Sequence, residues 1–298
     1  MSYAIFILLV ILQIGAISPA DVHQGLPFYG PDNIVIDARK HVLVTDSDHR
    51  RNFRIIELTS SGQYVTEWHF FRIAAAPAGP EGIAIDARGR IFATDAAARR
   101  VLEIAPSGKI LATFGGSGEF VNPGHVAVDA RENLYVADAA ANTITKLAPN
   151  GRTIASWHRT RGPGQNQFAG PESIALDSRS NLYVEDWGNH RLLQLAPDGR
   201  TVLTWGPGSG AARIGNSAGI AVDRLDHVYV ADWARHRIEV FRADGTFLGS
   251  ISNDPRRPAR FVNGPTSVAV DADGLVYYAD GNSVRVLDRR RRLVRTFS

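Results

Sequence analysis

Cysteine is absent from the 298-residue chain. Its absence excludes a disulfide framework, a thiolate zinc site and a cysteine nucleophile. Long runs of one charge are also missing, although Lys and Arg outnumber Asp and Glu by 33 to 30. The chain therefore has no arm of the kind that binds nucleic acid through charge alone. Beyond residue 20 no segment repeats its apolar residues with a helical period, which argues against an α-helical fold.

A long apolar run stands at the N-terminus, where residues 3–17 are apolar except for one Gln and one Gly. Its length suits the core of a signal peptide better than a membrane span, which needs about 20 residues. Ser18 and Ala20 supply the small residues that cleavage after Ala20 requires. We therefore expect residues 1–20 to be a signal peptide, with an uncleaved N-terminal anchor as the alternative. The remainder, residues 21–298, is expected to be secreted or periplasmic.

Copies of one pattern fill the chain from about Pro31 to Ser298. In each copy an apolar run ends in Asp, and a second apolar run ends in another Asp, as in "GIAIDARGRIFATD" and "SIALDSRSNLYVED". The first of these Asp residues falls at positions 37, 86, 129, 177, 223 and 271. The second falls at positions 46, 95, 138, 186, 232 and 280. Regular recurrence at a period of roughly 45 residues is typical of a repeat architecture.

Each copy holds four short runs rich in Val, Ile and aromatic residues, separated by Gly, Pro, Asp and Asn. Such runs are typical of strands, and the separating residues are typical of turns. Four antiparallel strands in a unit of this length form a propeller blade. The sequence therefore predicts an all-β fold, a six-bladed β-propeller of four-stranded antiparallel blades over residues 21–298.

The repeats resemble NHL repeats. The "NHRL" of Asn189 to Leu192 matches the motif that gives the family its name, and "ARHRI" at residues 234–238 is close to it. The resemblance extends over most of the chain, and it implies a six-bladed propeller. It does not imply one function, because NHL propellers serve as protein-binding, RNA-binding, sensor and enzymatic modules.

Two kinds of residue can be separated within a repeat. Asp186 recurs in every copy, which predicts a cap or turn role through bonds from its side chain to the backbone. Arg191 recurs as Arg54, Arg100 and Arg237, and we expect it to pack along its blade. Glu185 and Trp187 do not follow the repeat: position 185 is Thr or Ala elsewhere, and Trp187 recurs only as Trp233.

Binding residues are expected on one face of the ring, which we call the top. The first strand of each blade begins there and the second ends there, so the loops after the second and fourth strands lie on that face. Long loops of this kind usually carry binding residues. Two aromatic side chains at loop starts on neighbouring blades predict an exposed anchor patch. The candidate partner-binding residues are Trp187, Trp233, His190, His236, Arg161 and Arg257.

The residue just before the first strand of each blade faces the mouth of the channel, and it is acidic in three copies. With Glu185 on the adjacent strand, four carboxylates are candidates for one metal site: Asp32, Glu81, Glu172 and Glu185. Convergent carboxylates repel one another and are relieved by a cation, and oxygen ligands without His or Cys favour Ca²⁺. The alternative is a solvated acidic ring without an ion.

The repeats also resemble those of the peptidyl-hydroxyglycine α-amidating lyases, which share the six-bladed ring. That resemblance implies zinc-binding His residues directly after Pro, but the matching positions hold Glu81, Glu172 and Gly124. His125 comes one residue later, which places it on the opposite face of its strand, and the family's Tyr corresponds to Gly188. The three-His zinc site is absent, so zinc-dependent lyase activity is not expected.

One further motif fits the pattern of a serine hydrolase. "GNSAG" matches G-x-S-x-G, but the nucleophile elbow requires a strand, a turn and then a helix. Ser217 instead takes the Pro position ahead of a predicted strand, so we interpret the match as chance.

These observations predict an exported NHL-repeat propeller that binds a protein or small-molecule ligand through its top-face loops, and they lean against an enzyme. The alternative is a propeller hydrolase or lyase that uses a divalent cation at the channel mouth. RNA binding is a second alternative, suggested by basic loops such as residues 253–260, but the leader and the acidic mouth argue against it. Membrane contact is expected only through residues 1–20, if they remain uncleaved.

Overall fold

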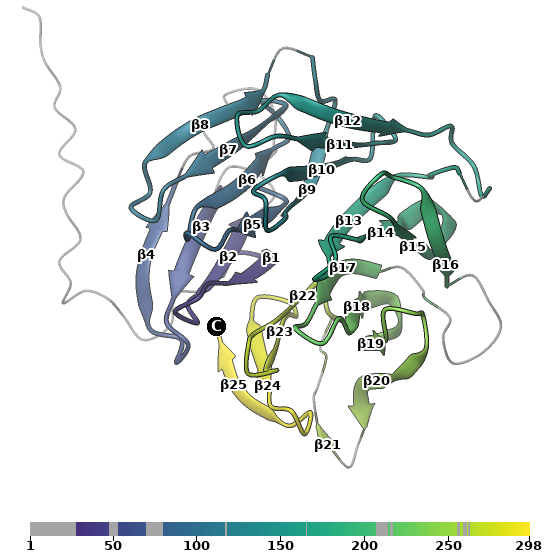
Figure 1. Cartoon of the computed structure of the whole chain (residues 1–298). Coiled ribbons are helices and arrows are strands. Elements are labelled where there is room, and N and C mark those ends of the chain that lie inside the picture. Colours follow the sequence, from purple (N-terminus) through teal and green to yellow (C-terminus); the bar gives the residue numbers. More distant parts are fainter. Residues whose placement is uncertain are drawn as a thin grey trace, which may run out of the picture.

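Figure 1 shows a computed structural model of the chain, in which short strands are arranged as a ring of small sheets. The structure describes residues 28–47, 53–69, 80–116, 118–164, 166–206, 214, 217–254, 257–258, 261 and 263–298, without the side chains of 253–254 and 257–258. The predicted signal peptide or anchor, residues 1–20, and the Arg257 side chain therefore lie outside the description. Within the described residues, no helix is long and apolar enough to cross a lipid bilayer.

The first three blades are antiparallel sheets of four consecutive strands. Blade 1 contains β1 (Pro31–Ile36), β2 (Val42–Ser47), β3 (Phe53–Leu58) and β4 (Tyr64–Trp68). Blade 2 contains β5 (Ile83–Ile85), β6 (Ile91–Asp95), β7 (Arg100–Ile104) and β8 (Ile110–Gly115). Blade 3 contains β9 (Pro123–Val128), β10 (Leu134–Asp138), β11 (Thr143–Leu147) and β12 (Thr153–His158).

The last three blades repeat the arrangement, and blade 5 adds a short fifth strand. Blade 4 contains β13 (Pro171–Leu176), β14 (Leu182–Asp186), β15 (Arg191–Leu195) and β16 (Thr201–Trp205). Blade 5 contains β17 (Ser217–Val222), β18 (Val228–Asp232), β19 (Arg237–Phe241), β20 (Phe247–Asp254) and β21 (Arg257–Pro258). Blade 6 contains β22 (Ser267–Val270), β23 (Val276–Ala279), β24 (Val284–Leu287) and β25 (Leu293–Phe297). The predicted six-bladed all-β propeller is confirmed.

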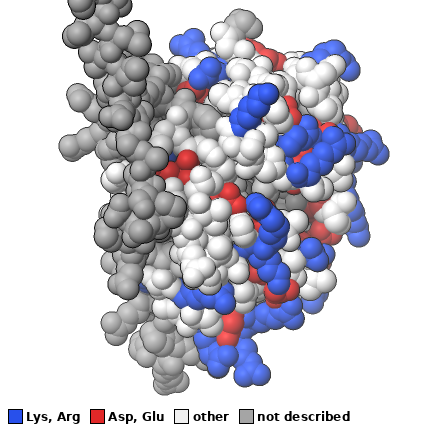
Figure 2. Space-filling view, turned by 90° about the vertical axis from the view of Figure 1, so that its left-hand side faces the viewer, with Lys and Arg blue, Asp and Glu red and all other residues white. Residues whose placement is uncertain are grey.

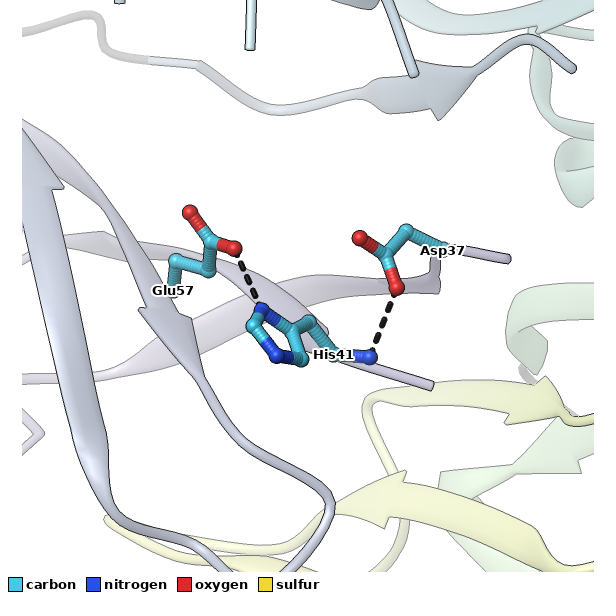
Figure 3. Close-up of side chains that lie close together, drawn as sticks. All are labelled: Asp37, His41 and Glu57. Atoms are coloured by element: carbon cyan, nitrogen blue, oxygen red, sulfur yellow. Dashed lines mark hydrogen bonds and ion pairs between the residues drawn. The ribbon is translucent and has the colours of Figure 1, made fainter. Parts of the chain in front are cut away.

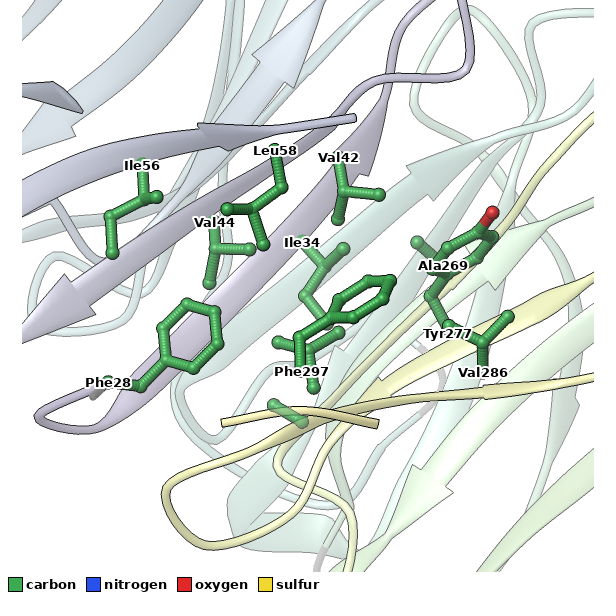
Figure 4. Close-up of a cluster of buried hydrophobic side chains, with 12 residues drawn as sticks. Phe28, Ile34, Val42, Val44, Ile56, Leu58, Ala269, Tyr277, Val286 and Phe297 are labelled. Carbon is green, nitrogen blue, oxygen red and sulfur yellow. The ribbon is translucent and has the colours of Figure 1, made fainter. Parts of the chain in front are cut away.

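The hydrophobic core lies between neighbouring blades. Strands two and three of each blade are almost wholly buried, because their Val, Ile, Leu and aromatic side chains pack against the blades on either side. Figure 4 shows the cluster that joins blade 1 to blade 6 and thereby closes the ring, including Phe28, Ile34 and Val44 of the N-terminal part and Tyr277 and Phe297 of the C-terminal part. The ring is therefore closed by packing, and each end blade is built from contiguous chain.

A glycine in the turn before the fourth strand leaves space for an aromatic side chain of the preceding blade. Gly62 has a φ of 89°, and a Cβ there would lie 2.4 Å from the ring of Phe297. Gly199 has a φ of 87° and meets Trp157 of the preceding blade in the same way. Because the turn needs the left-handed region and the aromatic ring needs the space, only Gly satisfies both demands.

The Asp that ends each second strand is buried and caps backbone N–H groups. Asp46 accepts bonds from the N–H groups of Tyr29 and Gly30 at 2.9 Å each. Asp186 accepts one from Ala169 at 2.6 Å. The predicted cap role is confirmed, and it ties the incoming loop to the top of its blade.

The repeated Arg contributes more than packing. Arg54, Arg100 and Arg191 form ion pairs with the capping Asp of their own blade, at 2.8, 2.9 and 2.7 Å. Arg237 forms an ion pair with Glu239, which lies in the same blade.

Candidate functional site

Strand register defines the top face. In blade 4, Pro171 at the start of β13 lies opposite Asp186 at the end of β14, and in blade 5 Ser217 lies opposite Asp232 in the same way. The segments that follow Asp186 and Asp232 therefore emerge beside the entrance of the channel. This is the geometry that the sequence predicted for the top-face loops.

Two tryptophans stand exposed on this face. Trp187 is 47% exposed and Trp233 is 43% exposed, although each directly follows a fully buried Asp. Each opens a one-turn 3-10 helix, η2 (Trp187–Asn189) and η3 (Trp233–Arg235). The corresponding positions of the other blades hold only small residues: Ser47, Ala96, Ala139 and Gly281. The fold thus accepts a small side chain here, so packing does not explain either tryptophan.

The two predicted histidines close these turns. His190 and His236 both have a φ of 51°, and their backbone N–H groups bond to the carbonyl oxygens of Trp187 and Trp233. Arg99 occupies the same left-handed conformation in its blade, so the backbone role belongs to the repeat. The imidazoles are exposed beside the tryptophans. They are available to a ligand but make no metal cluster among the described residues.

Arg161 is exposed in the long loop that enters blade 4. This loop is fixed to the η2 turn, because the Asn189 side chain donates to the carbonyl of Gly162 at 2.8 Å. The Arg191 guanidinium also donates to the carbonyls of Pro163, at 2.6 Å, and of Gly164, at 2.8 Å. Arg161 and Trp187 are therefore presented by one hydrogen-bonded unit. Arg257 cannot be placed in the same way, since its side chain lies outside the described residues.

A buried polar pair joins blade 4 to blade 5 beneath this surface. Glu185 is 1% exposed, and its Oε1 accepts a bond of 2.5 Å from the Ser217 hydroxyl. Both residues depart from the repeat, because the other blades have Thr or Ala in place of Glu185 and Pro in place of Ser217. The Oε2 atom of Glu185 is buried without a hydrogen-bond partner. Both departures from the repeat therefore meet at the contact between blades 4 and 5.

Burial and like charge keep Glu185 protonated at neutral pH. Loss of solvent raises its pKa to about 8, and the negative charges of Glu172, Asp232 and Asp186 act in the same direction. The Ser217 hydroxyl opposes the shift because it stabilises the carboxylate. Glu172 is itself exposed at the mouth, and the atoms packed around it still raise its pKa.

The four predicted metal ligands do not form one compact cluster. Glu185 lies close enough to Glu172 for their charges to interact, and the Glu81 carboxylate lies beside Gly124 at the mouth. Among the described residues, however, three potential ligand atoms come within 4.8 Å of one another only at Asp37, His41 and Glu57. The Ca²⁺ site therefore stays a prediction, and side-chain movement or water would have to complete its coordination.

The Asp37, His41 and Glu57 group lies at the opposite, bottom end of blade 1 (Figure 3). His41 Nδ1 lies 2.6 Å from Glu57 Oε1, and the His41 backbone N–H donates to Asp37 at 2.7 Å. Arg39 bonds to both carboxylates at 2.8 Å, which neutralises them without an ion. Blade 2 has the same arrangement with Arg90 in place of the imidazole. The group is therefore a turn network of the repeat.

Surface charge offers no continuous basic face on the side that Figure 2 shows. Lys and Arg side chains there are interspersed with Asp and Glu. In the bottom turns of blade 2, Arg88 and Arg90 both form ion pairs with Glu132 at 2.7 Å. Paired basic residues of this kind lack the unneutralised charge that phosphate binding uses.

The central channel contains a cavity of about 280 Å³ that the first strands of all the blades line. Two polar side chains reach it, Asn33 from β1 and His125 from β9, and they bond to each other at 3.1 Å. The sequence predicted that His125 lies on the opposite face of its strand, because it follows the mouth position by one residue. The structure shows that this next position also borders the channel, so the pair of Asn33 and His125 was not predicted.

A family model for the NHL repeat matches residues 218–241, which span β17 to β19 of blade 5. No curated protein matches the chain. The chain is therefore a six-bladed β-propeller whose fifth blade matches the NHL repeat.

Solved structures agree in fold at low sequence identity. Virginiamycin B lyase from Staphylococcus aureus is 16% identical with a TM-score of 0.66, over 91% of this chain and 86% of that one. A protein of unknown function from Bacteroides thetaiotaomicron is 16% identical with a TM-score of 0.70, over 88% and 70%. A chain of the nidogen/laminin complex is 19% identical with a TM-score of 0.64, over 86% and 92%. These neighbours include a lyase and a member of a protein complex. The structural similarity therefore establishes the fold and does not identify an activity.

Proposed function

We propose that this propeller is a binding module that holds a protein partner on the top face of blades 4 and 5. The observation that carries the proposal is the exposure of Trp187 and Trp233 at positions where the repeat accepts small residues. Tryptophan is strongly enriched among residues that dominate protein interfaces, because it buries a large apolar area with few rotatable bonds. Arg161, His190 and His236 supply polar groups around the two rings.

The local backbone supports this role because it is already ordered. The 3-10 turns fix the start of each Trp side chain, and the bonds of Asn189 and Arg191 fix the neighbouring loop. A surface that is ordered before binding loses less conformational entropy on association.

The proposal includes export of the propeller, with residues 1–20 as a cleaved signal peptide. The apolar run of residues 3–17 and the small residues at Ser18 and Ala20 support it. N-terminal sequencing of the protein from the extracytoplasmic fraction tests the proposal. A start at Asp21 is expected, and an intact Met1 in the membrane fraction would favour the anchor instead.

The binding proposal is tested by placing a photo-crosslinking residue at position 187, at position 233 or at position 225. Leu225 is the matched control, because it is 76% exposed but lies in a bottom turn of blade 5. Crosslinks to one shared partner from positions 187 and 233, and none from position 225, are expected. Equal products from all three positions would refute a dedicated top-face site.

A second candidate function is cation binding at the channel mouth, which a hydrolase or lyase could use. The observation that favours it is the unpartnered Oε2 of Glu185 close to Glu172. A divalent cation would supply the missing partner and would displace the proton that Glu185 holds at neutral pH.

A further inference from the structure

The upper part of the channel is asymmetric. The position after the mouth residue holds Asn33 in blade 1 and His125 in blade 3, whereas the remaining blades have only small residues: Gly82, Ser173, Gly219 and Ser267. The Asn33–His125 bond therefore spans blade 2 along one side of the channel. The opposite side, formed by blades 4 to 6, carries no large side chain at this level.

Gly82 makes this bridge possible. A Cβ at Gly82 would lie 2.6 Å from the Cα of His125 and 2.5 Å from the carbonyl oxygen of Gly124. Such distances are shorter than van der Waals contact, so any side chain here would push β5 and β9 apart. The close approach lets the side chains of blades 1 and 3 meet across blade 2.

The bridge assigns a position to the proton of the imidazole. With the Asn33 amide nitrogen toward the ring, Nδ2 donates to His125 Nδ1, and in this assignment the ring proton resides on Nε2. Within the described residues no group bonds to Nε2 or to the Asn33 Oδ1 atom. Burial lowers the pKa of His125 to about 4, so the ring is neutral at physiological pH. His125 therefore presents a neutral N–H donor, held in one orientation, to the cavity.

The other walls of the cavity determine what it can accept. The other residues that line the cavity are Ile, Val, Ala and Leu, and successive residues of each strand line it partly through their backbone. The first strand of each blade is also a sheet edge, so part of its backbone N–H and C=O groups faces the channel unpaired. No Lys or Arg is among the residues that line the cavity, so an anion would find no cationic side chain there. These features together favour a neutral molecule that carries a hydrogen-bonding group.

We propose that the upper channel is a binding site for a small neutral molecule that carries a carbonyl group, which accepts a hydrogen bond from His125 Nε2. A cavity of about 280 Å³ admits a molecule with on the order of ten non-hydrogen atoms. Asn33 orients the imidazole and is a positioning residue of this site. The site is separate from the tryptophan surface and stands independently of the partner proposed for it.

Benzamide is the probe, and sodium benzoate is its charged counterpart of nearly equal shape. Binding is followed by saturation-transfer NMR and by the ¹⁵N shifts of the His125 ring at millimolar probe. Wild-type protein should bind benzamide, with a shift change at Nε2, and should bind benzoate about tenfold more weakly. The ¹⁵N shifts without probe should identify the Nε2–H tautomer.

Four variant proteins make the test specific. His125→Ala should lose benzamide binding, and His125→Gln, which retains an N–H donor, should keep part of it. Asn33→Ala should weaken binding and let the ring change tautomer. The Trp187→Ala/Trp233→Ala protein should bind benzamide as wild type does. Absence of benzamide binding to wild type, the Nδ1–H tautomer, or equal binding by a folded His125→Ala protein would overturn the proposal.

Discussion

Replacement of Glu185 with glutamine should remove a large part of the pH dependence of stability. Glutamine keeps an oxygen that accepts the Ser217 hydroxyl, and it resembles the protonated carboxyl group in shape. The change therefore removes titration while it preserves the contact between blades 4 and 5.

The size of this pH dependence follows from the raised pKa of Glu185. Burial raises the pKa of Glu185 to about 8 from an ordinary 4.5. Between these values the folded protein holds the proton and the unfolded chain has lost it, so unfolding releases a proton. Stability is then full below about pH 4.5 and falls by about 1.4 kcal/mol per pH unit until the folded pKa is reached. Between pH 5 and pH 8 this group lowers the free energy of unfolding by about 3 to 4 kcal/mol.

Urea denaturation of wild type and Glu185→Gln at pH 5, 6, 7 and 8, followed by far-UV circular dichroism, measures the difference. The two proteins should be close in stability at pH 5, and the variant should be more stable by about 3 kcal/mol at pH 8. Glu172→Gln is the comparison variant, and it should remove less of the pH dependence, because Glu172 is exposed and its charge contributes only part of the rise in the pKa of Glu185. Parallel pH profiles for wild type and Glu185→Gln would refute the assignment of a buried, protonated carboxyl group.

Two further predictions concern ring closure and the channel mouth. Phe297→Ala should destabilise the whole ring by about 3 to 5 kcal/mol, because it empties the contact between blades 6 and 1, whereas the exposed Val294→Ala on the same strand should change little. A single thermal transition, lowered in Phe297→Ala only, is expected; independent melting of one blade would contradict closure by packing. Millimolar Ca²⁺ should raise the melting temperature of wild type but not of Glu172→Gln/Glu185→Gln, since a cation that binds only the folded state stabilises it. No shift in wild type, or equal shifts in both proteins, would exclude the cation site.

The fold was predictable because the same pattern of strands and turns recurs in every blade. Each copy has similar turn residues and the same capping Asp. A strand that is ambiguous in one copy can therefore be assigned by comparison with the other copies. The exposed tryptophans were predictable for a related reason: Trp187 and Trp233 stand where other copies have small residues. A residue that departs from the repeat can be recognised by comparing the copies within a single sequence.

Contacts between copies were harder to predict. Comparison of the copies could have revealed Ser217 and Glu185 as paired departures, but their contact depends on which faces of blades 4 and 5 meet. The bond between Asn33 and His125 depends on the approach of β5 to β9 at Gly82, which no local pattern encodes. The ion pair between Arg237 and Glu239 was also hard to predict, because Glu239 stands at a position that is apolar in several other blades.

The central claim is that the top face of blades 4 and 5 binds a partner through its tryptophans. The most direct test is the Kd of the crosslinked partner for wild type, for Trp187→Ala/Trp233→Ala and for the bottom-face control Leu225→Ala, with melting temperatures measured on the same samples. The account predicts that the double variant keeps its melting temperature and loses about 2 kcal/mol of binding free energy or more, roughly a thirtyfold rise in Kd, while the control binds as wild type does. An unchanged Kd for a folded double variant would contradict it.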